Sequence, residues 1–430
     1  MTPAAPAPRF ALIDGNTFYV SCERVFDPRL HNVPVVVAGN GDGCAIAIST
    51  EARALGVRTG MPLFQLPAHI RRQIHVRSAN FALYGDLSAR IVHILSDLFP
   101  RVEIYSIDEN FIDVAGLPDA AERLMHARER ILRWVGIPCC VGLGATRTLA
   151  KAGNLLAKRH SRRQIRSDAR ALHHAGPSDL ADLAISDVWG IGKQLARRLH
   201  DEGIHTAADL VQTAATTLRQ RHGVVMARLQ RELQGTVCAD LDIAPARRQQ
   251  VMVSRTFAHA VEDPGEALVQ FTHTACARLR QHHLFAGAAW LFLEGRTLDG
   301  RPLHLARTAS LVTATQDTGV VMAAIRTQLK QLLQPGHRFH RAGIGLVDLS
   351  PAEARQGDLF APDDSRRLRH MAVIDRINAR FGTGTAGLGI AGCRPDHRQH
   401  SGQPDADWRP QPMARSPAYT TRWDQVLRVR

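Results

Sequence analysis

Two apolar runs decide the fold: Phe10-Ala-Leu-Ile-Asp14 and Val102-Glu-Ile-Tyr-Ser-Ile-Asp-Glu-Asn-Phe-Ile-Asp-Val114. Short apolar runs of this kind are typical of buried strands. Successive residues of a regular strand face opposite ways, so Asp108 and Glu109 can face one site only if the chain bends there. We therefore expect a hairpin bend after the first half of the second run. If the strand that ends at Asp14 lies beside this hairpin, three carboxylates come together.

The three acids, Asp14, Asp108 and Glu109, would then form a site for hard cations. A carboxylate at the end of an apolar strand is costly when it is buried without a partner. Three carboxylates supply oxygen ligands and negative charge for two Mg²⁺ ions about 4 Å apart, which His or Cys would not. The alternative is that each acid is a solvent-exposed turn residue at a strand end.

The charge of the chain is strongly positive. Lys and Arg number 54 and Asp and Glu 40 among 430 residues, which gives a net charge of +14. A positive field favours polyanions, either nucleic acid or an anionic membrane surface, although a merely soluble basic protein is the alternative. No apolar run approaches the roughly 20 residues that span a bilayer. The seven cysteines form no CxxC pair, so the reducing cytoplasm is the expected location.

The order of strands and helices divides the chain into parts. The first half alternates strands (10–14, 34–38, 44–49, 102–107, 111–114, 139–143) with helices (19–25, 51–55, 80–98, 119–135, and one from 146), which predicts an α/β layer. Residues 176–235 are helical throughout, with glycine punctuation. Residues 249–350 follow the order β-α-β-β-α-β, a split-βαβ unit. The last 80 residues predict an extended tail with one helix near 365–380.

The chain resembles the Y-family DNA polymerases in two motifs, Leu12-Ile-Asp14-Gly-Asn-Thr-Phe-Tyr19-Val-Ser-Cys-Glu23 and Tyr105-Ser-Ile-Asp108-Glu109-Asn-Phe111. Within that family it looks like UmuC, the catalytic subunit of bacterial DNA polymerase V, and the resemblance runs almost from end to end. Further matching stretches are Glu51-Ala-Arg53-Ala-Leu-Gly56, Thr148-Leu-Ala-Lys151, Val188-Trp-Gly-Ile-Gly192, Ser254-Arg255 and Ser416-Pro-Ala-Tyr419-Thr-Thr-Arg422.

This resemblance implies a right-hand polymerase architecture, combining α/β and α+β domains. The expected parts are a palm (9–25 and 84–172), small fingers (26–83), a helical thumb with a helix-hairpin-helix (173–243), a split-βαβ little finger (249–350) and a C-terminal tail (351–430). The implied activity is error-prone, template-directed translesion DNA synthesis in the SOS response to DNA damage. One rival is a catalytically inactive DNA- and clamp-binding accessory protein of mutagenic repair, against which the three retained acids argue. The other is a stand-alone DinB-type polymerase, against which the matching tail argues.

The resemblance also assigns roles around the acids. Asp14, Asp108 and Glu109 would be the catalytic ligands of two Mg²⁺ ions, and the backbone carbonyl of Gly15 would add a further ligand. Family members often have a larger residue at the position of Gly15. The two ions would activate the primer 3′-hydroxyl and stabilise the leaving pyrophosphate.

Three residues would contact the incoming nucleotide. Tyr19 falls at the family's steric gate, where a ring beneath the sugar excludes a 2′-hydroxyl by clash; a tyrosine that packs on the core is the alternative. Arg53 and Lys158 match positions that hold the triphosphate, for which a guanidinium and an ammonium are well suited.

Two further regions would contact DNA. Gly190, Gly192 and Lys193 belong to the helix-hairpin-helix, whose glycines let the backbone approach a phosphate and whose helix N-terminus binds it without reading sequence. A simple αα-hairpin is the alternative. Ser254, Arg255 and Thr256 on the first little-finger strand look like contacts to the DNA backbone.

The tail carries a peptide that resembles a sliding-clamp-binding motif, with Gln356, Leu359 and Phe360 as anchors. Gly357 stands where a leucine is usual, which should weaken binding. The partners that the resemblance implies are primer–template DNA, dNTPs, a processed UmuD-like dimer, RecA and the sliding clamp, with no membrane.

The palm departs from the family pattern at two places. Asn110 replaces a small residue, and the segment after Lys158 lacks the usual glycine-containing turn, so the last palm strand is uncertain.

Overall fold

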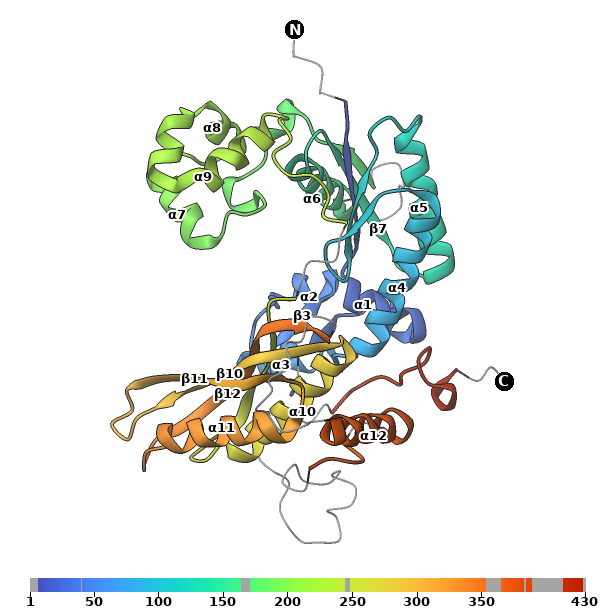
Figure 1. Ribbon diagram of the computed structural model, residues 1–430. Coiled ribbons are helices and arrows are strands. Elements are labelled where there is room, and N and C mark those ends of the chain that lie inside the picture. The colour runs from blue at the N-terminus through green and yellow to red at the C-terminus, as the bar shows by residue number, and fades with distance from the viewer. Residues whose placement is uncertain are drawn as a thin grey trace. The chain divides into compact units, whose positions relative to one another are not determined.

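The computed structural model describes residues 7–39, 41–163, 171–243, 248–352, 365–382, 384–388 and 413–427. The chain divides into two compact units, one of Met1–Pro245 with Pro412–Arg430 and the other of Ala246–Gln411. The colour scale of Figure 1 identifies both along the chain. The region expected as a C-terminal tail therefore contributes to both units.

A five-stranded sheet lies at the centre of the first unit, in the order β5-β6-β1-β7-β8. Its strands are β1 (Phe10–Gly15), β5 (Val102–Ile104), β6 (Glu109–Asp113), β7 (Cys139–Gly144) and β8 (Leu172–His174). β6 runs antiparallel to β1, and their register places Glu109 opposite Asp14. β5 pairs with β6 as a hairpin, so the expected bend before Asp108 is confirmed.

Helices cover both faces of this sheet. The side chains of β1 alternate between the two faces, and apolar residues are buried on each. Ala11 and Ile13 belong to a buried core shared with α1 (Phe18–Phe26), α4 (Phe81–Leu98) and α5 (Ala120–Val135). Leu12 lies on the opposite face, in a cluster with Ala150 of α6 (Arg147–Arg163). By the same alternation Asp14 faces α6. The alternation along β1 thus places Asp14 on the face of the sheet that α6 covers.

Glycines on β7 allow α6 to approach the sheet closely. A Cβ atom on Gly142 would lie 2.0 Å from the carbonyl oxygen of Ala150, and one on Gly144 would lie 2.6 Å from its backbone nitrogen. Any side chain at either position would therefore push the helix away from the strand. This close contact brings the polar face of α6 within reach of the end of β1.

A second sheet of three strands, in the order β3-β2-β4, belongs to the same unit. It consists of β2 (Val35–Ala38), β3 (Ala45–Ile48) and β4 (His75–Ser78), and the short helices α2 (Thr50–Ala54) and α3 (Ala68–Arg71) accompany it. β4 was not expected from the sequence, because of its four residues only Ser78 is fully buried and no apolar alternation marks it. Ser78 also forms a parallel bridge with Arg415 of the C-terminal segment.

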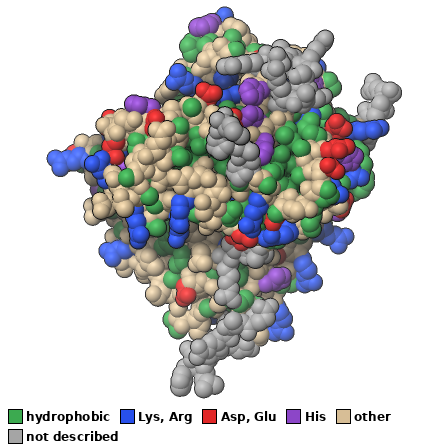
Figure 2. Space-filling model, turned by 90° about the horizontal axis from the view of Figure 1, so that it is seen from above, with side chains coloured by type: hydrophobic (Ala, Val, Ile, Leu, Met, Phe, Trp, Pro, Cys, Tyr) green, Lys and Arg blue, Asp and Glu red, His purple; other side chains and the backbone are tan. Residues whose placement is uncertain are grey.

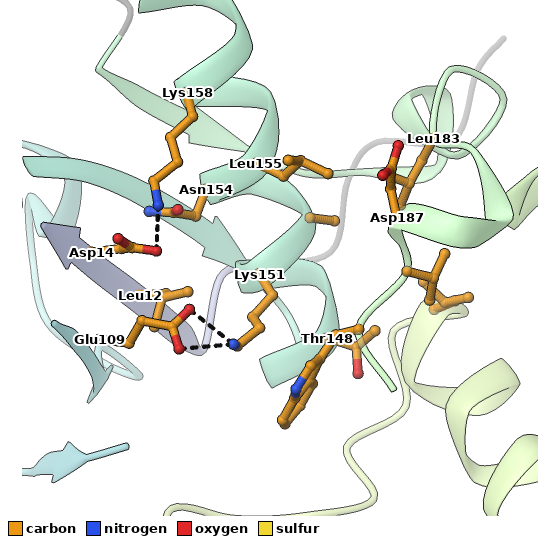
Figure 3. A pocket seen from close by; sticks show the side chains of 14 residues that line it. Leu12, Asp14, Glu109, Thr148, Lys151, Asn154, Leu155, Lys158, Leu183 and Asp187 are labelled. Atoms are coloured by element: carbon orange, nitrogen blue, oxygen red, sulfur yellow. Dashed lines mark hydrogen bonds and ion pairs between the residues drawn. The ribbon is translucent and has the colours of Figure 1, made fainter. Parts of the chain in front are cut away.

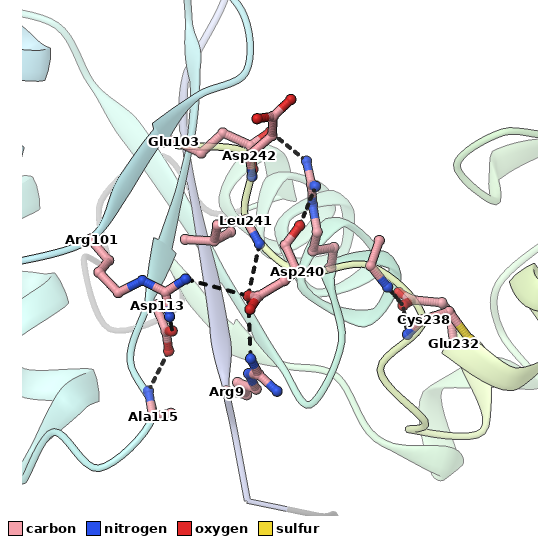
Figure 4. A network of polar contacts seen from close by, with 12 residues as sticks. Arg9, Arg101, Glu103, Asp113, Ala115, Glu232, Cys238, Asp240, Leu241 and Asp242 are labelled. Carbon is pink, nitrogen blue, oxygen red and sulfur yellow. Dashed lines mark hydrogen bonds and ion pairs between the residues drawn. The ribbon is translucent and has the colours of Figure 1, made fainter. Parts of the chain in front are cut away.

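A small helical part follows, with α7 (Lys193–Asp201), α8 (Ala207–Gln212) and α9 (Ala215–Leu233) around an apolar core to which Leu149 and Ala152 of α6 also belong. The chain then returns to the five-stranded sheet through a polar network, drawn in Figure 4. In it Arg147 donates to Oε1 of Glu103 at 2.6 Å and to the carbonyl oxygen of Asp240 at 3.0 Å. The backbone N–H of Asp242 donates to the other oxygen of Glu103 at 2.9 Å. These contacts fasten the end of the helical part to the sheet.

The second unit confirms the β-α-β-β-α-β order. Its elements are β9 (Val251–Val261), α10 (Gly265–Gln281), β10 (Leu284–Arg296), β11 (Pro302–Thr315), α11 (Thr318–Leu332) and β12 (Arg338–Pro351). The sheet is antiparallel in the order β11-β10-β12-β9, and α10 and α11 share one apolar core with it. α12 (Ser365–Phe381) is tied to α10 by an ion pair of 2.6 Å between Asp375 and Arg280.

Candidate active site

The acids Asp14 and Glu109 lie opposite each other at the end of β1 and β6. The backbone N–H of Gly15 donates to the carbonyl oxygen of Asp108 at 2.9 Å, which continues the ladder past the acid pair. A Cβ atom on Gly15 would lie 2.9 Å from Cδ2 of Phe18, so a larger residue would need this ring to move. All three predicted acids therefore belong to one end of one pair of strands.

Two lysines of α6 neutralise these acids (Figure 3). The Nζ atom of Lys158 lies 2.5 Å from Oδ2 of Asp14. The Nζ atom of Lys151 lies 2.9 Å and 3.1 Å from the two carboxylate oxygens of Glu109. The lysines are seven residues apart, two turns of helix, and so share one face of α6.

Asp108 has a different partner. Its Oδ1 accepts a hydrogen bond of 2.7 Å from the hydroxyl of Ser106. The same hydroxyl oxygen accepts from the backbone N–H of Glu109 at 3.1 Å. Ser106 therefore shapes the bend that separates Asp108 from Glu109, and it holds the Asp108 carboxylate on the hairpin.

Burial is the largest influence on the pKa of Asp14. Burial raises the pKa of Asp14 to about 7, the nearby Lys158 lowers it, and the charges of Asp108 and Glu109 raise it further. The Oδ1 atom of Asp14 is buried and accepts no hydrogen bond. A buried carboxylate with an unsatisfied oxygen among other carboxylates suits a cation, so this donor set fits Mg²⁺.

The carboxylates are not yet gathered as metal ligands. Among the residues that the structure describes, no group of three His, Cys, Asp or Glu side chains is arranged to hold a metal ion. The ion pairs explain this, because Lys158 and Lys151 draw Asp14 and Glu109 toward α6 while Ser106 holds Asp108.

A cavity of about 250 Å³ opens beside the two ion pairs. Its lining includes Asp14 and Glu109 of the sheet, Lys151 and Lys158 of α6, and Trp189. The cavity therefore has both the acids and the ammonium groups in its wall, a combination that suits a phosphorylated ligand and its counter-ion.

Tyr19 stands in the first turn of α1, directly after β1. Its ring stacks on that of Tyr84 with centroids 4.7 Å apart, and it meets Phe81 edge-on at 5.9 Å. Burial raises the pKa of Tyr19, and the negative charge of Asp108 raises it further. Tyr19 is thus half-buried between an aromatic support and the acidic site.

Family models match most of the chain. The model described as the impB/mucB/samB family matches residues 13–154, and the model of that family's C-terminal domain matches residues 248–359. Residues 369–429 match a domain described as one of unknown function. Proteins ImpB and UmuC of Salmonella typhimurium are both 34% identical, ImpB over 97% of this chain and 98% of its own length, and UmuC over 98% and 100%. The chain belongs to the impB/mucB/samB family of Y-family DNA polymerases.

Other relatives agree with this placement. A DNA polymerase IV of Pelotomaculum thermopropionicum is 31% identical over 86% of this chain and 92% of that protein. Among solved structures, a Y-family chimera of Dbh and Dpo4 matches with a TM-score of 0.62 and 20% identity over 80% of this chain and 99% of that one. As a UmuC-like Y-family polymerase, the protein is a DNA-directed DNA polymerase of the translesion class.

The remaining predicted nucleotide contact, Arg53, is exposed on α2. Among the described residues, neither Arg53 nor Tyr19 lines the cavity beside the acids, whereas Lys158 does. The structure thus brings Lys158 to the metal-ligand candidates and leaves Arg53 on α2, outside the lining of this cavity.

The glycine turn for which the sequence predicted a helix-hairpin-helix is open, with the short 3₁₀ helix Ile185–Asp187 before it and α7 after it. Gly190 has a φ of +90°, a conformation that favours glycine, and Gly192 is the N-cap of α7. A shallow depression of about 400 Å³ there is lined by Gly192, Lys193, Gln194, Leu195 and Arg198. The depression thus has two cations, Lys193 and Arg198, beside an open glycine.

The three candidate DNA contacts of the second unit do not share one face of β9. Arg255 pairs with Ala342, a core residue, whereas Ser254 pairs with Gly343 and Thr256 with Arg341. Strand alternation therefore puts Ser254 and Thr256 on the sheet face away from the helices. Burial and the nearby Arg278 lower the pKa of Arg255.

Two other predictions have different outcomes. The clamp-binding anchors Gln356, Leu359 and Phe360 lie outside the described residues. The last palm strand, which the sequence left uncertain, is present as β8, and α6 continues to Arg163 where a glycine turn was usual.

Basic side chains outnumber acidic ones in this protein. Figure 2 shows Lys and Arg side chains at many points of one face, with Asp and Glu at fewer, in agreement with the net charge of +14. Across the described parts of the chain, no helix has the length and apolar character needed to cross a membrane.

Lys151 was not predicted to belong to the site, although the stretch Thr148-Leu-Ala-Lys151 matches the family. The signal that could have found it is its spacing of seven residues from Lys158 on one predicted helix.

Proposed function

We propose that this polymerase carries out nucleotidyl transfer with two Mg²⁺ ions held by Asp14, Asp108 and Glu109, and by the carbonyl of Gly15. The observation that carries the proposal is the register of β1 and β6, which sets Asp14 opposite Glu109 beside a half-buried Asp108. The unsatisfied Oδ1 of Asp14 supports a cation there. Bound Mg²⁺ would lower the pKa of the primer 3′-hydroxyl and neutralise charge on the phosphates.

The lysines of α6 have a second role in this proposal. Lys158 and Lys151 neutralise the acids in the metal-free protein. Their ammonium groups also face the cavity, where they would bind the triphosphate of the incoming dNTP. Arg53 would approach the same triphosphate from α2, where its side chain is exposed.

Tyr19 would act as the steric gate. Its ring stacks on Tyr84 and meets Phe81 edge-on, so it cannot move away from a 2′-hydroxyl without disturbing this cluster of three rings. Selection for deoxynucleotides then arises from a clash rather than from an attractive contact.

Several partners follow from the family and its relatives. Gly190, Gly192 and Lys193 would bind the DNA backbone, and so would Ser254 and Thr256. By likeness to UmuC, we propose a processed UmuD-like dimer, RecA and the sliding clamp as partners of an SOS response in the cytoplasm. Gln356, Leu359 and Phe360 are the candidate clamp anchors.

The test is primer extension across an abasic template site with Mg²⁺, with and without the clamp, UmuD-like dimer and RecA filament. We expect extension by the wild type and its loss in Asp108→Ala. Glu122→Ala, which removes an exposed acid of α5, should extend like the wild type. Extension by Asp108→Ala at the wild-type rate would exclude the proposed ligand set. Absence of extension by every variant, with DNA binding intact, would indicate an accessory protein.

A further inference from the structure

The C-terminal segment 413–427 lies against the small sheet and α4. The backbone N–H of Ser78 donates to the carbonyl oxygen of Ala414 at 3.1 Å, and the N–H of Ala414 donates back to the hydroxyl of Ser78 at 2.9 Å. The ring of Tyr419 stacks on Phe26 of α1 with centroids 4.5 Å apart and an angle of 9°. The segment is thus bound by both backbone and side-chain contacts.

Asn80 holds the middle of this segment. It is the N-cap of α4 and is 1% exposed. Its Nδ2 donates to the carbonyl oxygen and hydroxyl of Ser416, at 3.1 Å and 3.0 Å, and to the carbonyl oxygen of Pro417 at 3.1 Å. The helix that begins at this cap carries Tyr84 one turn later.

Glu23 connects the segment to Tyr84. Glu23 is 2% exposed, and its Oε1 accepts a hydrogen bond from the hydroxyl of Tyr84 at 2.7 Å and another from Ser416 at 3.0 Å. Burial raises the pKa of Glu23, while these two hydrogen bonds lower it. The buried carboxylate of Glu23 holds both hydroxyl groups in place, because the loss of either hydrogen bond would leave this carboxylate less well satisfied.

Tyr84 in turn supports Tyr19, since the two rings stack at 4.7 Å and 19°. A continuous series of contacts therefore runs from Ser416 through Glu23 and Tyr84 to Tyr19. Ser416 and Tyr84 lie far apart in the sequence, so only the folded C-terminal segment completes the series.

We propose that segment 413–427 is a brace that positions Tyr19 and so sets the discrimination between deoxynucleotides and ribonucleotides. The brace rests on the proposed role of Tyr19 as the steric gate. It assigns a role to a stretch whose matching family model is described as having no known function. Ser416 is a positioning residue here, because it acts through Glu23 and Tyr84.

The experiment compares the efficiency of dNTP and rNTP incorporation by full-length variants, under the conditions in which the wild type extends a primer. Tyr19→Ala should lose discrimination most strongly. Ser416→Ala should lose about threefold to tenfold in the dNTP:rNTP ratio, which corresponds to the ordinary net contribution of one hydrogen bond. Ser416→Thr should restore the ratio. Trp423→Ala, which removes a ring that is 96% exposed in the same segment, should leave it unchanged.

A second variant separates positioning from folding. Tyr84→Phe keeps the stacked ring and deletes only its hydroxyl, so it should reproduce the effect of Ser416→Ala. The double variant should lose no more than either single variant, because both interrupt one series of contacts. Additive losses would mean that the two hydroxyls act independently and would overturn the brace.

The outcomes distinguish the brace from the gate. If Tyr19→Ala loses discrimination while Ser416→Ala and Tyr84→Phe keep the wild-type ratio, the gate stands and the brace is wrong. If Tyr19→Ala itself discriminates like the wild type, the gate fails and the inference fails with it. Losses in all three variants, with Trp423→Ala unaffected, support the brace.

Discussion

Lys158 and Asp14 form a close ion pair of 2.5 Å at the centre of the candidate site. Asp14 is buried at the end of β1, and Lys158 projects from α6, which can approach because β7 has glycines at 142 and 144. The pair neutralises one oxygen of a buried carboxylate, Oδ2, and leaves Oδ1 without a hydrogen bond. The same ammonium faces the cavity in which a triphosphate would lie, so one residue serves the metal-free protein and the nucleotide complex.

Replacing Lys158 should weaken nucleotide binding. We expect Lys158→Met to raise the KM for dNTP by about tenfold or more, because a charge-assisted contact to phosphate is lost, with a smaller effect on kcat. Steady-state kinetics of single-nucleotide insertion measure both constants. Arg133→Met, which removes an exposed cation of α5, is the control. An unchanged KM in Lys158→Met would remove Lys158 from the nucleotide site.

The raised pKa of Asp14 should make the metal-free protein less stable as the pH increases. Its folded-state pKa of about 7 lies above the ordinary 3.8, so the native state binds this proton more tightly than the unfolded state. The stabilisation is present at low pH and is lost between about pH 4 and pH 7.

Asp14→Asn removes this titration and should therefore abolish the loss. Between pH 4 and pH 7 in EDTA, the free energy of unfolding of the wild type should fall relative to that of Asp14→Asn by about 1 kcal/mol or more. Denaturant titrations measure it, with Asp97→Asn, an exposed acid on α4, as the charge-matched control. Parallel pH profiles for wild type and Asp14→Asn would contradict the assignment.

Arg147 should be essential for stability. Arg147→Met leaves Glu103 buried without its ion-pair partner, and the side chain of Glu103 is only 7% exposed. Breaking a buried pair on one side costs about 3–5 kcal/mol. The comparison is Arg90→Met, which removes an exposed i,i+4 pair with Asp86 and should cost less than about 1 kcal/mol. Equal effects in denaturant titrations would show that the network in Figure 4 is not structural.

Lys193 should contribute to DNA affinity without reading sequence. We expect Lys193→Ala to weaken primer–template binding equally for unrelated sequences and to reduce the slope of log K against log [salt] by about 1. Fluorescence anisotropy over a series of salt concentrations measures both quantities, with Arg133→Ala as the control. A loss confined to one template sequence would argue against a backbone contact.

Much of the fold could be predicted because its signals are local. Apolar runs and helical spacing located β1, β6, β7, α4 and both helices of the second unit. β4 was not predicted because its sequence is mostly polar. The strands of the second unit extend beyond the predicted apolar stretches, because hairpin pairing continues through exposed residues.

The site was only partly predictable, because its finer features depend on tertiary contacts. The three acids stood out at strand ends, but the partner of Glu109 is Lys151, which only the approach of α6 to the sheet reveals. The contacts of Ser416 with Glu23 and Asn80 join residues more than 300 positions apart. No periodicity in the sequence encodes such a contact, and the tail therefore looked simply extended.

The proposed site for two Mg²⁺ ions is tested by a crystal structure of the complex with primer–template, a non-hydrolysable dNTP analogue and Mn²⁺, with anomalous data at the manganese edge. We expect two anomalous peaks bounded by Asp14, Asp108 and Glu109, with Lys158 moved from Asp14 to the triphosphate. A bound nucleotide with no anomalous peak at these carboxylates, and with the Lys158–Asp14 pair intact, would contradict it.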